Sequence, residues 1–251
     1  MWRPTNHTEE DFAAFREAMD ASPVEAVIIH AVYLINCAST DKELRKKSQQ
    51  SLTHALRIGD AIGAAGVVLH PGSQKDEPLV PSIKRAAKTI ASSLKETESC
   101  RLLLEQTAGH KGLLARDFEQ IADLIDGAGG DKRLGLCLDS CHLFVQGYDI
   151  TDEAHLAAVL DEADAKVGIE RLGAVHVNDA AAPLGSCRDR HANLGKGEMG
   201  KQGLAAFLSE PRFEGLPATL ETPGPIKKGP DRKEVQAAKR LRKTGLKRRQ
   251  G

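Results

Sequence analysis

Side chains of the types that bind metal ions recur along the sequence at regular intervals. Six of them directly follow a short apolar run, and they are His30, His70, Glu105, Asp139, His176 and Glu221. The intervals between them are 40, 35, 34, 37 and 45 residues, which suits one strand and one helix each. Imidazole nitrogens and carboxylate oxygens are ligands for zinc or manganese. The pattern therefore predicts a metal site.

Three further ligand types lie close to these positions. His142 is three residues after Asp139, and Asp189 and His191 form an Asp-x-His pair in the polar segment that follows His176. Residues two apart in an extended segment point the same way, so both side chains of the pair reach one ion. The chain thus offers nine candidate ligands.

Six apolar runs must position the first six of these residues. The runs are 26–29, 66–69, 101–104, 134–138, 172–175 and 217–220. Each is too short for a helix, and continuous apolarity indicates strands buried on both faces. Amphipathic segments over 9–19, 41–62, 116–126 and from Thr151-Asp152 onward are the expected helices.

Alternating strands and helices predict right-handed βαβ units and an α/β fold of the TIM-barrel type. Such barrels carry their active sites at the carboxyl ends of the strands. One polar residue there is usually a cap or a solvated group. Six polar groups crowded at one barrel mouth need a partner, and metal ions supply it.

Composition sets wider bounds on the 251 residues. The 41% hydrophobic content excludes a wholly disordered chain, and no apolar run is long enough for a membrane span. There is no signal-peptide pattern at the N-terminus. Five scattered cysteines favour a reducing compartment over a disulfide scaffold. We therefore expect a cytoplasmic protein, nucleoid-associated if bacterial.

The charge balance is uneven along the chain. Lys and Arg equal Asp and Glu overall, 35 of each, yet residues 227–251 carry a net +9 and residues 1–226 a net −9. An acidic body argues against a simple electrostatic nucleic-acid binder. We expect a barrel domain over 1–226 and a basic C-terminal helix or tail over 227–251. This tail either binds phosphate or is solvated, and composition favours the solvated state.

Two other patterns carry less weight. Residues 195–200 match G-x-G-x-x-G but follow a polar loop, so we interpret them as a flexible loop and not a dinucleotide site. Cys137 and Cys141 are possible ligands by type, although Cys137 lies within an apolar run and is expected to be a small buried hydrophobe.

The segments around the nine residues carry a family resemblance that runs from about Trp2 to Pro223. The chain resembles the endonuclease IV family of apurinic/apyrimidinic endonucleases, within the xylose isomerase-like TIM-barrel superfamily. The matching segments are HAVYLIN (30–36), HPGS (70–73), LEQTAG (104–109), CLDSCH (137–142), GYD (147–149), HVND (176–179), DRH (189–191) and LETP (220–223).

The resemblance implies a site for three zinc ions, with manganese as an alternative at one position. His30, His70 and Glu105 would hold the first ion. Glu105 would bridge to a second, held also by Asp139, His176 and Glu221. His142, Asp189 and His191 would hold the third. Glu105 and Glu221 are thus the expected catalytic residues.

The resemblance also implies a substrate and a reaction. The expected partner is double-stranded DNA with abasic sites, bound by a monomer. The expected reaction is hydrolysis of the phosphodiester 5′ to the abasic site, leaving a 3′-hydroxyl and a 5′-deoxyribose phosphate in base excision repair. Tyr33 and Leu34 would form a minor-groove wedge, with ordinary loop packing as the alternative for Tyr33. Arg188 and Arg190 either contact phosphates or are solvated loop charges.

Two other classes of function compete with this one. A metal-dependent sugar isomerase or epimerase on a related barrel would explain the strand-end ligands. It would not need His142, Asp189 and His191, and no strand-end Lys is present. A non-catalytic DNA-binding or scaffold protein would be expected to have lost ligands, and all nine are filled.

The number of strands predicts an incomplete barrel. A closed barrel of this type needs eight strands, and only six runs are found. Compared with the family, the first strand, the first helix and the second strand are missing before the segment that matches, as is an Arg used beside the Tyr wedge. Either the start codon is placed too far downstream, or the chain is a true truncation or domain fragment. The nine intact ligands favour the first explanation, so we expect upstream in-frame DNA to encode about 30–40 more residues, one βα unit plus a strand. We also expect the 251-residue chain alone to be poorly soluble or weakly active.

Overall fold

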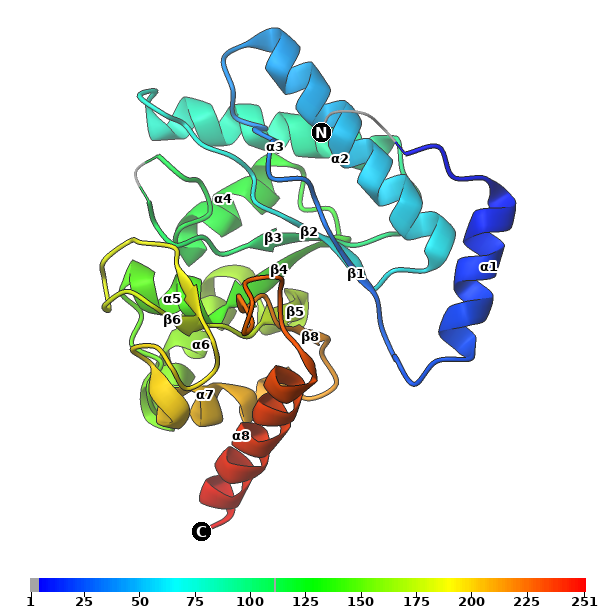
Figure 1. The fold of residues 1–251 in the computed structure, drawn as a ribbon. Coiled ribbons are helices and arrows are strands. Elements are labelled where there is room, and N and C mark those ends of the chain that lie inside the picture. The colour runs from blue at the N-terminus through cyan, green and yellow to red at the C-terminus, as the bar shows by residue number, and fades with distance from the viewer. Residues whose placement is uncertain (1–4, 111) are drawn as a thin grey trace.

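The protein is built around one parallel sheet, seen in a computed structural model that describes residues 5–110 and 112–251 (Figure 1). Trp2, where the family resemblance begins, lies outside these residues. Six strands lie side by side in the order β1-β2-β3-β4-β5-β8, and all neighbours are parallel. The strands are β1 (Ile28–His30), β2 (Gly66–Leu69), β3 (Leu102–Glu105), β4 (Leu134–Asp139), β5 (Leu172–His176) and β8 (Ala218–Thr219). Each predicted apolar run forms one of them, in order.

Helices lie between these strands, and a side chain caps the start of every described helix except α3 and α7. The helices are α1 (Glu9–Asp20), α2 (Lys42–Ile62), α3 (Leu79–Lys95), α4 (Phe118–Gly127), α5 (Ser140–Gln146), α6 (Glu153–Val167), α7 (Gly200–Leu208) and α8 (Arg232–Gln250). Asp41, Asp117 and Asp152 accept hydrogen bonds from backbone N–H groups in the first turns of α2, α4 and α6. Short 3-10 turns cover Ile169–Arg171 and Pro211–Phe213.

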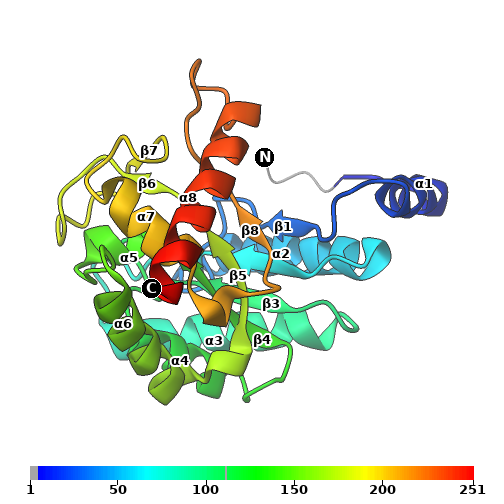
Figure 2. The ribbon, with the colours of Figure 1, turned by 90° about the horizontal axis from the view of Figure 1, so that it is seen from below.

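Helices α2, α3, α4, α6 and α7 form a layer around the outer face of the curved sheet, and α1 projects away from it beside α2 (Figure 2). In α2, Leu52 and Leu56 are fully buried against it, as the helical spacing predicts. The basic segment folds as α8, which packs closely on α7 because Gly245 has no side chain. A Cβ there would lie 2.1 Å from the carbonyl oxygen of Ala205. No helix among the described residues has the length and apolarity needed to cross a membrane.

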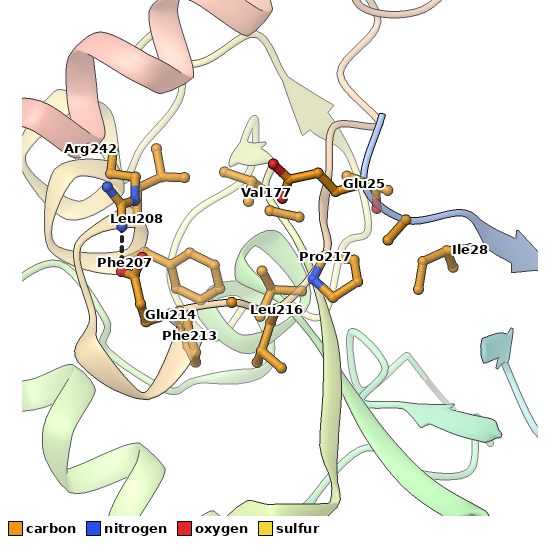
Figure 3. Close-up of a pocket in the computed structure, with 15 residues that line it drawn as sticks. Glu25, Ile28, Val177, Phe207, Leu208, Phe213, Glu214, Leu216, Pro217 and Arg242 are labelled. Carbon is orange, nitrogen blue, oxygen red and sulfur yellow. Dashed lines mark hydrogen bonds and ion pairs between the residues drawn. The ribbon is translucent and has the colours of Figure 1, made fainter. Parts of the chain in front are cut away.

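The sheet is open between β1 and β8, which gives part of a barrel, as predicted. Within residues 5–110 and 112–251, neither strand pairs its outer edge with another strand. A cavity of about 680 Å³ lies between the two edges, with Ile28 on one side and Leu216 and Pro217 on the other (Figure 3). The inner face of the sheet, together with the loops at the carboxyl ends of its strands, carries the candidate site.

Candidate metal centre

The two-residue period of the strands aims the candidate ligands at the inside of the sheet. A small cluster of side chains packs on that inner face, comprising Ile28, Val68, Leu103, Cys137 and Ala174. Each is two residues before a candidate ligand, namely His30, His70, Glu105, Asp139 and His176. Residues two apart in a strand share a face. The inner layer therefore continues into a layer of ligand-type side chains, and Cys137 is the buried hydrophobe that was predicted.

Glu105 is the centre of this layer. Its side chain is fully buried, and four imidazole rings surround its two oxygens. Oε2 lies 3.1 Å from Nε2 of His30 and 2.9 Å from Nε2 of His70. Oε1 lies 3.1 Å from Nδ1 of His176 and 3.2 Å from Nδ1 of His142. Each oxygen thus faces a different pair of histidines, which is the arrangement of a bridging carboxylate.

A second group extends from Glu105 along β4, β5 and the end of β8. The parallel register places Asp139 level with His176. Nδ1 of His176 lies 3.9 Å from Oδ2 of Asp139 and 3.3 Å from Oε2 of Glu221. Glu105, Asp139, His176 and Glu221 each offer one ligand atom within 4.8 Å of the others. The Glu221 side chain is 33% exposed, so the group opens to solvent on that side.

A third group depends on a hairpin that returns to the mouth of the sheet. Strands β6 (Asp179–Ala180) and β7 (His191–Ala192) pair antiparallel and bring the Asp-x-His pair back toward α5. Nε2 of His142 lies 3.3 Å from Oδ2 of Asp189, and Nε2 of His191 lies 3.2 Å from Oδ1 of the same carboxylate. The three side chains form a compact group of possible ligands.

Backbone carbonyl oxygens orient three of the histidine rings. In each, Nδ1 donates to a carbonyl, and the pairs are His30 with Ala31 (2.9 Å), His142 with Gln106 (3.0 Å) and His191 with Glu221 (3.2 Å). The hydrogen on Nδ1 leaves the Nε2 lone pair free for a metal. Nε2 of His191 is buried and faces the Asp189 carboxylate at 3.2 Å without a well-directed hydrogen bond. The donor set therefore fits metal ions by type, tautomer and direction.

The electrostatics of the cluster point the same way. Burial raises the pKa of Glu105, but the neighbouring His70 and hydrogen bonds from His142 and other rings outweigh it, so the pKa lies well below its usual value. Burial lowers the pKa of His191, yet the Asp189 and Asp139 carboxylates raise it to about 9. Buried carboxylates that raise the pKa of a neighbouring histidine favour positive charge at this place, and a metal ion supplies such charge.

Two residues add to the site beyond the nine. Asn178 donates from Nδ2 to Oδ2 of Asp139 at 2.6 Å and accepts the Glu221 N–H at Oδ1 at 2.9 Å. Cys141 forms a further possible ligand group with Asp139 and His191. Asn178 follows a strand-end His by two residues, a pattern that indicated nothing by itself. Only the fold shows that it joins two separate ligands.

The residues expected to bind DNA lie at the surface. Tyr33 is 86% exposed and Leu34 is 46% exposed, so the Tyr33 side chain does not pack into its own loop. Arg188 and Arg190 are exposed beside Asp189, and Nη1 of Arg190 donates to the Asp189 carbonyl oxygen at 2.7 Å. The role of these four residues in DNA binding stays a prediction.

Comparison with known proteins decides the family. Residues 2–244 match the family described as xylose isomerase-like TIM barrel. A "Probable endonuclease 4" of Geotalea daltonii is 35% identical over 224 residues, covering 88% of this chain and 79% of its own length. The crystal structure of endonuclease IV from Thermus thermophilus superposes with a TM-score of 0.79 at 33% identity, over 99% of this chain and 86% of that one.

The chain belongs to the endonuclease IV family. The same barrel occurs in other proteins, such as a D-tagatose 3-epimerase-like protein with a TM-score of 0.72 at 19% identity, covering 96% of this chain and 84% of that one. At that identity the likeness concerns the fold alone. The family match extends into α8, so the basic helix lies partly within the matched region.

Proposed function

We propose that this protein is a metal-dependent endonuclease that hydrolyses the DNA phosphodiester 5′ to an abasic site, leaving a 3′-hydroxyl and a 5′-deoxyribose phosphate, in base excision repair. One observation carries the proposal. Nine ligand-type side chains meet in three connected groups, with the fully buried Glu105 between two of them. The relatives named endonuclease 4 and the endonuclease IV structure support a nuclease acting on DNA.

Each group would hold one divalent ion, for which we propose zinc, with manganese as an alternative at one position. His30, His70 and Glu105 would hold the first, Glu105, Asp139, His176 and Glu221 the second, and His142, Asp189 and His191 the third. Such ions supply Lewis acidity and lower the pKa of a coordinated water toward neutrality. The four carboxylates do not cancel three divalent charges, so the loaded site would attract a phosphodiester even though residues 1–226 are acidic.

The protein's own side chains would do three things around that chemistry. Glu105 keeps two ligand groups at a fixed separation through its two oxygens. Glu221 lies at the solvent-facing side of the cluster, where a phosphate would arrive. Tyr33 and Leu34 project from the loop after β1 and would enter the gap left by the missing base. Arg188 and Arg190 would contact backbone phosphates beside Asp189.

The sugar isomerase alternative has less support. The third ligand group has no task in a one- or two-metal isomerase, and the hairpin that carries Asp189 and His191 is closed onto the cluster. We further propose that the enzyme acts as a monomer in the cytoplasm, in contact with the nucleoid if the source is bacterial.

The test is cleavage of a duplex with one abasic site by purified, metal-loaded protein, together with elemental analysis. We expect three metal ions per chain. Glu221→Gln should abolish cleavage and leave binding of abasic DNA largely intact, because it removes a ligand charge without touching Tyr33. Glu198→Gln is the matched control, since Glu198 is an exposed carboxylate at the same end of the sheet. Near-parental cleavage by Glu221→Gln, or active protein with one ion or fewer, would refute the assignment.

A further inference from the structure

A basic groove lies between helices α2 and α3, away from the metal centre. The helices pack side by side on the outer layer (Figure 1). They enclose a cavity of about 390 Å³ lined by Lys42, Arg45, Lys46, Gln49, Arg85, Lys88, Thr89 and Ser92. Five of these eight residues are cationic, and none is acidic. The groove is therefore a concentrated positive site on a part of the chain whose net charge is negative.

Carboxylates do not neutralise this groove. The Lys and Arg ion pairs of the described residues all involve other side chains. Asp41 and Glu43 flank Lys42 in sequence. Asp41 accepts hydrogen bonds from two N–H groups in the first turn of α2, and Glu43 neither lines the groove nor forms an ion pair among the described residues. Glu96 is engaged by Arg57 and Gln49. Five like charges gathered in one groove repel one another, so an anion in the groove would be favoured.

Two of the cations are held in place by the backbone. Arg85 donates from Nε to the carbonyl oxygen of Ala38 at 2.9 Å and from Nη2 to Oγ of Ser82 at 3.0 Å. Arg45 donates from Nη1 to the carbonyl oxygen of Ser39. Both guanidinium groups are half-buried, so they are fixed charges rather than freely moving ones. Lys42, Lys46 and Lys88 are exposed around them.

The backbone atoms that hold these arginines belong to the loop after β1. Ala38 and Ser39 form the end of the segment that carries Tyr33 and leads into α2. The groove is thus connected to the proposed wedge loop by direct hydrogen bonds. A duplex held at the wedge would extend from it in two directions for many base pairs, each contributing phosphates at about 3.4 Å intervals per strand.

We propose that this groove binds backbone phosphates of duplex DNA that flank the abasic site. The proposal rests on the proposed function, because it assigns the substrate a second contact outside the metal centre. Lysines and fixed arginines around a groove provide positioning contacts to phosphate oxygens and carry no sequence preference. A small phosphorylated molecule offers the same chemistry, and the experiment separates the two sources.

The experiment measures binding of the metal-loaded protein to an intact duplex without an abasic site, over a range of salt concentrations. The test variant combines Lys42→Gln, Lys46→Gln and Lys88→Gln, which leaves both loop-anchoring arginines in place. Each lost phosphate contact should reduce the slope of log affinity against log salt by about 0.9, so the triple variant should lose about 2.7.

The matched control combines Lys239→Gln, Lys243→Gln and Lys247→Gln, three exposed lysines on α8 with the same change of net charge. We expect its slope to stay close to that of the parent. Equal slopes for the test variant and the parent, or equal losses in both triple variants, would overturn the proposal. Tight binding of inorganic phosphate in the groove with no change in the duplex slope would assign it to a small phosphorylated ligand instead. Loss of cleavage in the parent would count against the proposed function, whereas the intact-duplex slopes test the groove independently.

Discussion

Asn178 offers the sharpest test of how the metal centre is built. Its amide donates to Asp139 at 2.6 Å and accepts the Glu221 N–H at 2.9 Å, and Nδ2 lies 3.5 Å from the Glu221 carboxylate. Asn178→Ala removes these bonds at a fully buried position. Two groups lose their partner, the Asp139 carboxylate and the Glu221 N–H, and each such loss costs about 1–3 kcal/mol. We therefore expect a loss of about 2–6 kcal/mol in the free energy of unfolding.

The same change should weaken metal binding. Loss of a residue that orients metal ligands typically reduces metal affinity by about 10–100-fold, which is about 1.4–2.7 kcal/mol. The assays are zinc titration against a competing chelator and urea unfolding of the chelated protein. The two readouts separate a ligand-orienting role from a purely structural one.

Asn193→Ala is the matched control for this experiment. Asn193 accepts the Gly224 N–H at 2.9 Å and is not among the ligand groups of the described residues. Its loss should cost about 1 kcal/mol of stability and leave zinc affinity unchanged. If Asn178→Ala bound zinc as tightly as the parent while unfolding more easily, Asn178 would be a structural residue only and the reasoning would be wrong.

Three further predictions concern the exposed Tyr33 side chain, the protonation of His191 and the hydrogen bonds of Asp60. Tyr33→Ala should reduce the preference for abasic over intact duplex by about 5- to 140-fold without changing metal content, since loss of an aromatic contact to a base costs about 1–3 kcal/mol. Equal losses on both DNAs would indicate a folding defect instead. In protein from which a chelator has removed metal, the pKa of His191 is raised to about 9. The charged His191 ring should therefore contribute its full amount to folding stability below about pH 6.5, and this contribution should be lost as the pH rises through about 9. Zinc affinity should increase over the same range because protons compete with the metal, and a flat zinc titration would contradict this. Burial raises the pKa of Asp60, but hydrogen bonds from the N–H groups that follow α3, beginning with Glu98, outweigh it and leave the pKa below its usual value. Asp60→Asn should lower the free energy of unfolding by about 1–2 kcal/mol near neutral pH. This loss should shrink as the pH drops through the pKa of Asp60 in the folded protein. An equal loss when urea unfolding is measured at acid pH would refute the prediction.

Local patterns were sufficient for the six strands of the main sheet and for the candidate ligand types at their ends. Apolar runs predicted the six strands, and Asp41 and Asp152 marked helix starts, because caps and strand faces depend on neighbours in sequence. The ligand types at the strand ends could be predicted to meet because parallel strands align their carboxyl ends. Helices α3, α5 and α7 and the hairpin β6–β7 were not predicted. For α3 the local signal is present, since Ile83, Ile90 and Leu94 are buried at helical spacing, whereas the two-residue strands of the hairpin depend on pairing with each other and packing on α5.

The sequence by itself determined which side chains meet at the mouth of the sheet, whereas the tertiary structure alone decided how they meet. The division of four histidines between the two oxygens of Glu105 depends on strand register and ring orientation. The bridge by Asn178 and the groove of Arg45 and Arg85 join residues about 40 positions apart. Sequence periodicity reports only which face a residue occupies within its own element. Contacts between elements follow from packing and from backbone carbonyls that no local pattern identifies.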